Sequence, residues 1–230
     1  MPSPAAWRVR LEPFLEILFP TRCAGCGSAH AVWCDGCRSR LLPVSSTVCL
    51  ACRRVFPAEA TGDRCGPAAP RAWAVAVYRP PLDRAIKHLK YRPDARLAQA
   101  LAGSMADVYR RHRLSATCLV PVPLSRRRQR QRGYNQAELL GRALAGLLGL
   151  PSLPSAAVRI RETGSQVGLE AGERWANVDG AFAADPSLVR DETVLLIDDV
   201  HTTGATLAAC SQALAQAGAR RVVGLTVGRA

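Results

Sequence analysis

Two adjacent carboxylates and a threonine-rich turn stand together near the end of the sequence. Asp198 and Asp199 follow Val194–Ile197, an apolar run with the length of a buried strand. Thr202–Thr206 (TTGAT) comes next, and apolar residues at helical spacing begin there. Backbone N–H groups at a turn that enters a helix bind phosphate, and carboxylates accept hydrogen bonds from sugar hydroxyls or hold a cation through water. The pattern predicts a site for a ribose 5-phosphate.

The same stretch has other interpretations. It lacks the Gly-Lys-Ser/Thr ending of a Walker-type phosphate loop. It is also similar to the acidic pair of receiver domains, but there the pair lies on the first strand, whereas only 31 residues follow Asp199 here. A solvated turn with accidental acids is the remaining alternative.

Cysteines in the first third of the sequence form a metal-binding pattern. Cys23 and Cys26 are followed by Cys34 and Cys37, in the spacing CxxC-x7-CxxC. Two such turns supply four thiolates for a tetrahedral structural zinc ion. The alternative is that these cysteines are small core residues. We predict a zinc site on these four residues.

A second cysteine group is incomplete. Cys49 and Cys52 form a third pair, and Cys65 has Ala68 where the next cysteine of a pair would stand. A second zinc would need Asp63 or a distant ligand, so we interpret this group as degenerate; alternatively, its pair joins one of the earlier pairs in a single site. We predict core positions for the two other cysteines, Cys118 and Cys210.

Basic residues suggest an anionic partner. The net charge is +13, from 31 basic and 18 acidic residues, which fits either nucleic acid or phosphorylated small molecules. Arginines crowd one segment, at positions Arg126, Arg127, Arg128, Arg130 and Arg132. We expect Arg126 and Arg127 to clamp a diphosphate and the others to form a rim for nucleic-acid phosphates, the alternative being a solvated basic face. Lys87 and Lys90 are the only lysines, three positions apart on a predicted helix, and we expect a compact ammonium to serve there where a guanidinium would not.

Composition and periodicity divide the chain into two predicted units. Residues 1–70 contain a short amphipathic helix at Trp7–Pro20 and the cysteine-rich module, with a loop at Pro57–Pro70. Residues 71–230 alternate strand and helix signals. Strands are predicted at 73–78, 118–122, 178–182, 194–197 and 222–227. Helices are predicted at 97–108, 140–148 and 207–217. This alternation predicts an α/β fold whose mainly parallel sheet is flanked by helices, with ligands at the carboxyl ends of the strands.

No membrane-inserted or export segment is predicted. Glu12 and Glu16 interrupt the apolar residues of the first helix. We therefore expect a cytoplasmic, reducing location, where CxxC pairs favour metal over disulfides.

The stretch Val194–Thr206 resembles the phosphoribosyl-diphosphate motif of type I phosphoribosyltransferases. Together with the cysteine module, nearly the whole chain resembles the ComF (ComFC, GntX-like) family. Three further stretches carry the resemblance: Leu89–Tyr91, Val120–Leu140 and Arg161–Phe182. Ala68 departs from the cysteine pattern that we expect in the later part of the module.

The resemblance implies a type I phosphoribosyltransferase-like domain behind a zinc ribbon. It implies transfer of a 5-phosphoribosyl group from phosphoribosyl diphosphate to an unknown acceptor, with Mg²⁺ on the diphosphate. Asp198 and Asp199 would be the catalytic residues, at the ribose 2- and 3-hydroxyls, and the diphosphate would lie near Pro123–Arg126. The 5-phosphate would be held by Thr202, Thr203, Gly204, Ala205 and Thr206.

The resemblance also implies a loop within Arg161–Asn177 that closes over the site, with four residues of interest: Thr163, Ser165, Gln166 and Arg174. An alternative function keeps the fold without catalysis. In it the protein is a DNA-handling or regulatory module of natural transformation that binds single-stranded DNA and a helicase-like partner.

Overall fold

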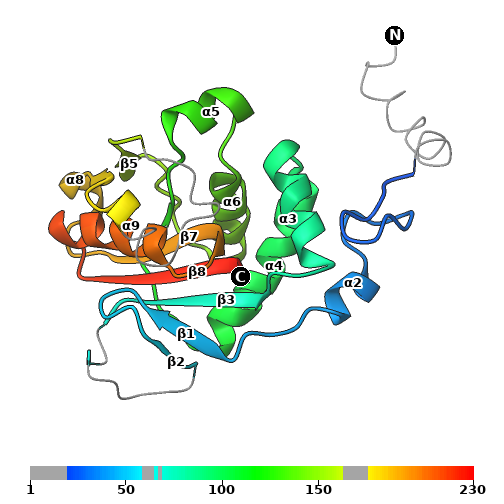
Figure 1. The fold of residues 1–230 in the computed structure, drawn as a ribbon, viewed down its shortest axis with the longest axis horizontal. Coiled ribbons are helices and arrows are strands. Elements are labelled where there is room, and N and C mark those ends of the chain that lie inside the picture. Colours follow the sequence, from blue (N-terminus) through cyan, green and yellow to red (C-terminus); the bar gives the residue numbers. More distant parts are fainter. Residues whose placement is uncertain (1–19, 59–64, 67–68, 163–175) are drawn as a thin grey trace, which may run out of the picture.

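The computed structural model describes residues 20–58, 65–66, 69–162 and 176–230. A six-stranded sheet in the order β2-β1-β3-β8-β7-β4 runs through the molecule (Figure 1). Its strands are β1 (Ser46–Cys49), β2 (Val55–Pro57), β3 (Arg71–Val77), β4 (Cys118–Pro121), β7 (Thr193–His201) and β8 (Arg221–Arg229). The last four of these are mutually parallel, whereas β1 is antiparallel to both of its neighbours.

Helices cover both faces of the sheet. One core packs α3 (Leu82–Tyr91), α4 (Ala95–Arg111) and α6 (Gln136–Leu148) against the sheet. The other core packs α9 (Ala205–Gln216) and the short α8 (Pro186–Val189) on the opposite face. A separate two-stranded ribbon, β5 (Ala157–Arg159) with β6 (Phe182–Ala184), contributes to this second core. The predicted fold class, a mainly parallel α/β sheet behind a cysteine-rich module, is confirmed.

Local sequence signals explain how the segment around β4 is held. Ser125 caps α5 (Arg126–Arg132) by accepting a hydrogen bond from the N–H of Arg128 at 3.3 Å. Asn135 caps α6 through the N–H of Ala137 at 3.0 Å and donates its amide to the carbonyl of Val122 at 3.0 Å. One buried side chain therefore ties the end of β4 to the start of α6 and fixes the loop between them.

Most predicted elements are confirmed, with two instructive differences. The run at 178–182 was wrongly predicted as a strand: Val178 is helical, and the strand β6 begins only at Phe182. Val178 and Ala181 are both buried without belonging to a strand. The arginine-rich α5 and the β1–β2 hairpin were not predicted, since neither has an apolar period. The predicted helix Trp7–Pro20 lies almost entirely outside the described residues.

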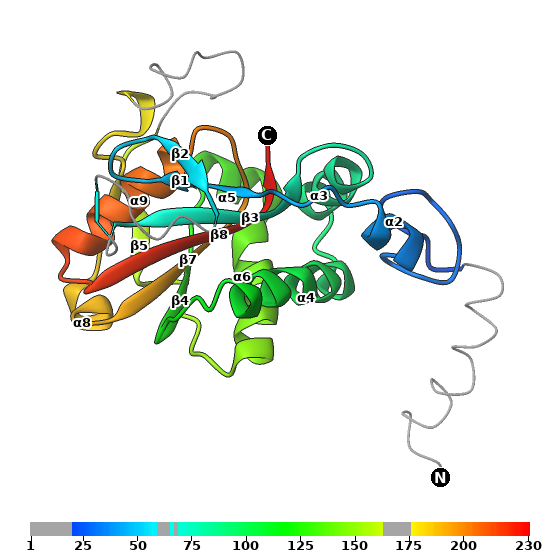
Figure 2. The same ribbon diagram turned by 90° about the horizontal axis from the view of Figure 1, so that it is seen from below.

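The cysteine-rich segment contacts the α/β domain at two places. Its hairpin joins the main sheet, with Val48 paired to Ala72 and Cys49 to Arg71. The first four cysteines and α2 (Asp35–Ser39) lie at one end of the molecule beside α3 (Figure 2). A division at residue 70 therefore stays a prediction, because β1 and β3 on its two sides are strands of one sheet. Among the described residues no helix is both long and apolar enough to cross a membrane.

Candidate functional site

The two predicted carboxylates lie at the carboxyl end of β7, and a lysine from α3 reaches them. The Nζ of Lys90 is 3.0 Å from Oδ2 of Asp199; the two side chains are 26% and 6% exposed. Each carboxylate also accepts a backbone N–H at 2.8 Å, Asp198 from Asp199 and Asp199 from Val200. Lys87, by contrast, forms a surface pair with Asp83 at 3.3 Å. The two lysines of the chain thus have different roles, and Lys90 belongs to the site.

Charge is concentrated in this buried corner. Burial, helped by the adjacent Asp199 carboxylate, raises the pKa of Asp198 to about 8. Burial alone would lower the pKa of Lys90, but the carboxylates of Asp199 and Asp198 raise it overall. The lysine therefore stays protonated and compensates the acids. With both acids ionised the three groups carry one net negative charge, and the carboxylates can accept hydrogen bonds from a polyhydroxyl ligand.

The threonine-rich turn leads from β7 into α9. Gly204 adopts φ +79°, the left-handed region, and stands at the N-cap of this twelve-residue helix. The N–H of Ala205 donates to Oγ1 of Thr203 at 3.4 Å. A Cβ at Gly204 would lie 3.3 Å from Cγ1 of Val48 and 3.4 Å from Cδ2 of Leu50. The predicted phosphate loop therefore rests on strand β1 of the cysteine-rich segment.

The loop after β4 lies next to the acidic strand end. β4 pairs in parallel with β7, matching Pro121 to Ile197, so the carboxyl ends of both strands meet at one edge. Beyond this loop, Arg126 and Arg127 lie on the exposed helix α5. The N–H of Arg127 donates to Glu162 at 3.1 Å, and this contact is the main reason why the pKa of Glu162 is lowered. The diphosphate-binding role of these arginines stays a prediction.

Arg159 is a site residue that the sequence analysis missed. It comes from β5 and stacks on Phe182 with 5.3 Å between the guanidinium carbon and the ring centroid. Burial and the charge of Arg128 lower its pKa, while the nearby acids Glu162 and Asp198 act in the opposite direction. An isolated arginine in a three-residue strand has no local signal, so only the fold places it near the acids.

His201 ends β7 and is buried. Its Nδ1 is 2.8 Å from the hydroxyl of Thr226, and burial lowers its pKa to about 4. The Thr226 hydroxyl has carbonyl acceptors at Trp73 and Gly228, so the neutral imidazole donates its Nδ1 proton to Thr226. Of the predicted closing loop, all four residues of interest lie outside the described residues: Thr163, Ser165, Gln166 and Arg174.

The first four cysteines have the geometry of a metal site. Sγ of Cys23 is 3.6 Å from Sγ of Cys37, and Sγ of Cys26 is 3.6 Å from Sγ of Cys34. Four thiolates bound to zinc at about 2.3 Å would have sulfur–sulfur distances of about 3.8 Å. The four residues therefore fit one structural zinc ion. Both Cys118 and Cys210 are buried core residues, as predicted.

The second cysteine group also converges. Sγ atoms of Cys49, Cys52 and Cys65 all lie within 4.8 Å of one another, and the N–H of Cys52 points to Sγ of Cys49 at 3.4 Å. Cys49 is fully buried, and the other two are partly exposed. The alternative in which this pair joins an earlier pair is wrong, because the two groups are separate clusters.

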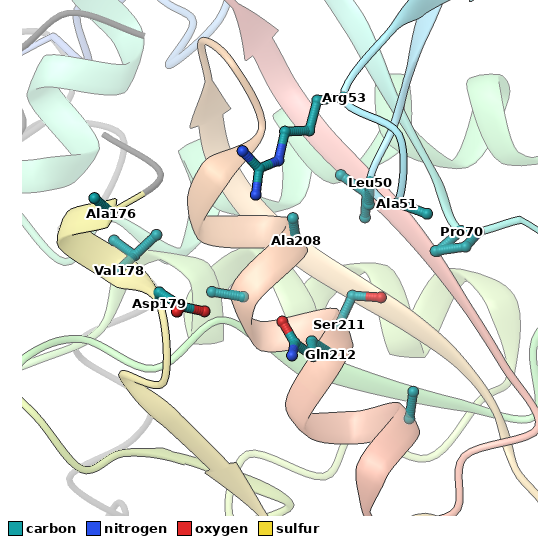
Figure 3. A pocket seen from close by; sticks show the side chains of 12 residues that line it. Leu50, Ala51, Arg53, Pro70, Ala176, Val178, Asp179, Ala208, Ser211 and Gln212 are labelled. Atoms are coloured by element: carbon teal, nitrogen blue, oxygen red, sulfur yellow. The ribbon is translucent and has the colours of Figure 1, made fainter. Parts of the chain in front are cut away.

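A cavity of about 500 Å³ lies between the turn after β1 and the side of α9 (Figure 3). Arg53 reaches toward it from the turn, opposite Asp179, and Ser211 and Gln212 line it from α9 (Figure 3). The acidic pair and the threonine-rich turn are not among its lining residues. The candidate site is thus distinct from this cavity and rests on the strand ends of the sheet.

Known proteins similar to this chain share both of its parts. Residues 14–67 match the double zinc ribbon domain family. Competence protein F of Haemophilus influenzae is 32% identical, and the match covers 89% of this chain and 95% of that protein. DNA utilization protein YhgH of Escherichia coli is 34% identical, with 82% of this chain and 86% of that protein covered.

Two solved structures match this chain in part. The allosteric regulatory enzyme of purine biosynthesis has 20% identity and a TM-score of 0.40, covering 60% of this chain and 29% of the other. Adenine phosphoribosyltransferase from Thermoanaerobacter pseudethanolicus has 17% identity and a TM-score of 0.35, with 63% and 69% covered. The near full-length match to competence protein F, with cysteine clusters ahead of a mainly parallel sheet, shows that the chain belongs to the ComF family.

Proposed function

We propose that this protein binds phosphoribosyl diphosphate at the carboxyl end of β7 and transfers its 5-phosphoribosyl group to an acceptor. One observation carries the proposal: an acidic pair, of which Asp199 is buried and paired with Lys90, leads directly into a glycine-containing turn at the start of α9. The N-terminus of a long helix suits a phosphate, and the carboxylates beside it suit the ribose hydroxyls.

Each residue would act by positioning and by charge. Asp198 and Asp199 hold the ribose hydroxyls, and the turn Thr202–Thr206 holds the 5-phosphate. Arg126 and Arg127, with the loop after β4, neutralise the departing diphosphate. Mg²⁺ bound to the diphosphate would supply additional positive charge there. Little proton transfer is required of the protein, since the reacting ribose carbon develops positive charge as the diphosphate leaves.

Calorimetry with phosphoribosyl diphosphate and Mg²⁺ tests the binding site. Wild type is expected to bind, and Asp199→Asn is expected to lose at least ten-fold in affinity, equivalent to about 1.4 kcal/mol. Asp107→Asn, at an exposed position on α4, is the control for charge and is expected to bind like wild type. Absence of binding by wild type would refute the site.

Turnover needs a separate measurement. Diphosphate release in the presence of a panel of amine and nucleobase acceptors is expected to require Mg²⁺ and to fall in Asp198→Asn. Binding without release for every acceptor would leave a ligand-binding domain and contradict the transferase part of the proposal.

A second function is favoured by the exposure of α5. Every residue from Arg126 to Gln131 is exposed, so several guanidinium groups are available to a polyanion. Similar proteins are named for competence and for DNA utilization. We propose that this helix contacts single-stranded DNA and that a helicase-like protein hands the strand over.

Salt-dependent binding to single-stranded DNA tests this second function. Reversing two charges on α5 (Arg127→Glu with Arg130→Glu) is expected to weaken binding and to reduce the salt slope by about 1.4, the share of two phosphate contacts. The control reverses two exposed charges on another helix, Arg110→Glu with Arg111→Glu, and so has the same net charge. Equal loss in both variants would indicate nonspecific attraction and count against a role for α5.

A further inference from the structure

We propose that the cavity beside α9 binds a guanine nucleotide, with its base against the helix and its phosphate at Arg53. The cavity has a volume of about 500 Å³, within the range of pockets that hold small organic ligands. Neither the acidic pair nor the threonine-rich turn lines it, so this site is separate from the carboxyl end of β7. The inference therefore stands independently of the proposed function.

Two segments far apart in the sequence form opposite walls of this cavity, and hydrogen bonds hold both (Figure 3). On one side the N–H of Leu50, just after β1, donates to the carbonyl of Pro70 at 2.8 Å. On the other side the guanidinium of Arg161 donates to two backbone carbonyls, that of Asn177 at 3.4 Å and that of Asp179. The cavity is therefore formed in advance, which lowers the entropic cost of binding a ligand.

Helix α9 forms the floor between the two walls, and its surface there is largely smooth. Three of the five residues that line the cavity from α9 are alanines, Ala208, Ala209 and Ala215. Leu50 and Val178 add apolar surface at the walls and are 5% and 0% exposed. A flat ring can lie against the alanines because they have no side-chain atom beyond Cβ. This part of the cavity therefore suits a heteroaromatic base.

A buried hydroxyl group on the same helix also lines the cavity. Ser211 is only 3% exposed, and none of the described residues forms a hydrogen bond with its hydroxyl. A buried hydroxyl without a partner is unfavourable, and a ligand with a polar edge would supply that partner. The amide of Gln212, the next residue, offers the ligand both a donor and an acceptor.

The charged residues indicate how the ligand is oriented. Arg53 reaches toward the cavity from one wall, and Asp179 lies on the other (Figure 3). A guanidinium binds phosphate through paired hydrogen bonds, whereas an ionised carboxylate only accepts hydrogen bonds. Guanine presents two adjacent N–H groups that one carboxylate can accept. A guanine nucleotide therefore matches both walls of the cavity.

Calorimetry with guanosine monophosphate (GMP) tests the cavity. Wild type is expected to bind GMP, and Ala215→Trp, which places an indole ring in the cavity, is expected to weaken binding at least ten-fold. Gln216→Trp adds the same side chain at the next exposed position of α9, outside the cavity, and is expected to bind like wild type. Absence of binding by wild type, or equal binding by the two variants, would overturn the proposal.

Removing the arginine charge tests where the phosphate lies. Arg53→Asn keeps a residue that tolerates the φ of +64° at this position. It is expected to weaken GMP binding at least five-fold and to leave the binding of guanosine, which has no phosphate, unchanged. Arg54→Asn, at an exposed position on the same turn but outside the cavity lining, is expected to bind GMP like wild type. An equal loss for both ligands, or for both variants, would contradict a phosphate at Arg53.

A base comparison tests the contact with Asp179. Wild type is expected to prefer GMP to AMP, because adenine lacks the pair of adjacent N–H groups. Asp179→Asn is expected to abolish this preference. A preference that persists in the variant would contradict recognition of the base by this carboxylate.

A nucleoside monophosphate is also the kind of product that a phosphoribosyl transfer would release, so the strand ends need a control. Asp199→Asn is expected to bind GMP like wild type. Binding that is lost in Asp199→Asn and kept in Ala215→Trp would place the nucleotide at the end of β7 and overturn the cavity site. If wild type binds GMP as expected but fails to bind phosphoribosyl diphosphate, the proposed function fails and the present inference stands.

Discussion

At the residue scale, the ion pair between Lys90 and Asp199 stabilises the two adjacent carboxylates at the end of β7 in the folded protein. Two carboxylates at the end of β7 repel each other, and Asp199 is nearly excluded from water. The ammonium of Lys90 offsets one of these charges from a different element. Tyr134 helps to place that lysine, because its hydroxyl donates to the carbonyl of Leu89 at 2.8 Å. The site is therefore charged and pre-organised before any ligand arrives.

Removing the Lys90 charge is expected to destabilise the protein. Lys90→Met leaves a buried carboxylate without its partner, which costs about 3 kcal/mol of unfolding free energy near neutral pH. Lys87→Met, in a surface pair whose lysine is 62% exposed, is expected to cost less than about 1 kcal/mol. Chemical denaturation near neutral pH measures the effect; equal losses in the two variants would contradict it.

The raised pKa of Asp198 predicts a pH-dependent stability. The folded carboxyl keeps its proton up to about pH 8, whereas the unfolded one releases it near pH 4. Between these values the folded state binds more protons, so this group's contribution makes the unfolding free energy fall as pH rises. Asp198→Asn is expected to be more stable than wild type at pH 8 by a margin that narrows toward pH 5. Guanidinium titrations at several pH values measure the difference in unfolding free energy between the variant and wild type. A difference that does not change with pH would contradict the prediction.

At the element scale, the sequence predicts the site residues that lie next to one another in the chain, but not those that the fold brings together from different elements. The strand, the acids and the glycine turn lie within fourteen residues, Val194–Leu207, so the sequence alone predicts them as one motif. The partner of Asp199 comes from α3, and Arg159 comes from β5, and no local period connects them to β7. The hairpin β1–β2 was missed because its strands have only four and three residues, too few to show an apolar period.

The packing of the turn into α9 on β1 gives a prediction with a matched control. Gly204→Ala adds a methyl group between Val48 and Leu50 in a backbone that already disfavours side chains. Gly133→Ala meets the same backbone penalty at φ +77° with nothing within 4 Å of the added carbon. We expect about 1 kcal/mol of destabilisation for Gly133→Ala and at least about 1 kcal/mol more for Gly204→Ala. Thermal unfolding of both variants measures the two losses of stability. A larger loss for Gly133→Ala than for Gly204→Ala would contradict the packing of Gly204 against β1.

At the scale of the whole molecule, the cysteine-rich segment is a structural part of the sheet. Sequence composition suggested a separate module ending near residue 70, because cysteines and loop residues replace the apolar period there. The structure pairs β1 with β3 and places Trp33 and Cys37 in the same core as α3. The sequence contains no signal for these contacts, since strand pairing at an edge depends on backbone groups that every residue carries.

Truncation tests this integration. A fragment 44–230, which keeps the β1–β2 hairpin, is expected to stay monomeric and to unfold cooperatively. A fragment 71–230 exposes the edge of β3 and loses the support of Val48 and Leu50, so we expect it to aggregate or to lose most of its stability. Size-exclusion chromatography and circular dichroism compare the two. Equal behaviour would show that the hairpin is dispensable and that residue 70 is a true domain boundary.

The position of β8 has a consequence for the order in which this chain folds. This strand, at Arg221–Arg229, lies between β3 and β7, which are separated in the sequence by more than one hundred residues. Until those nine residues have been synthesised, β3 and β7 have no common neighbour, and the acids of β7 have no finished sheet behind them. The first four cysteines, Cys23 to Cys37, are synthesised long before that point and need no contact with β8 to gather around a zinc ion. Zinc can therefore be bound before the sheet closes, whereas the proposed ligand site depends on contacts distant in sequence and forms late.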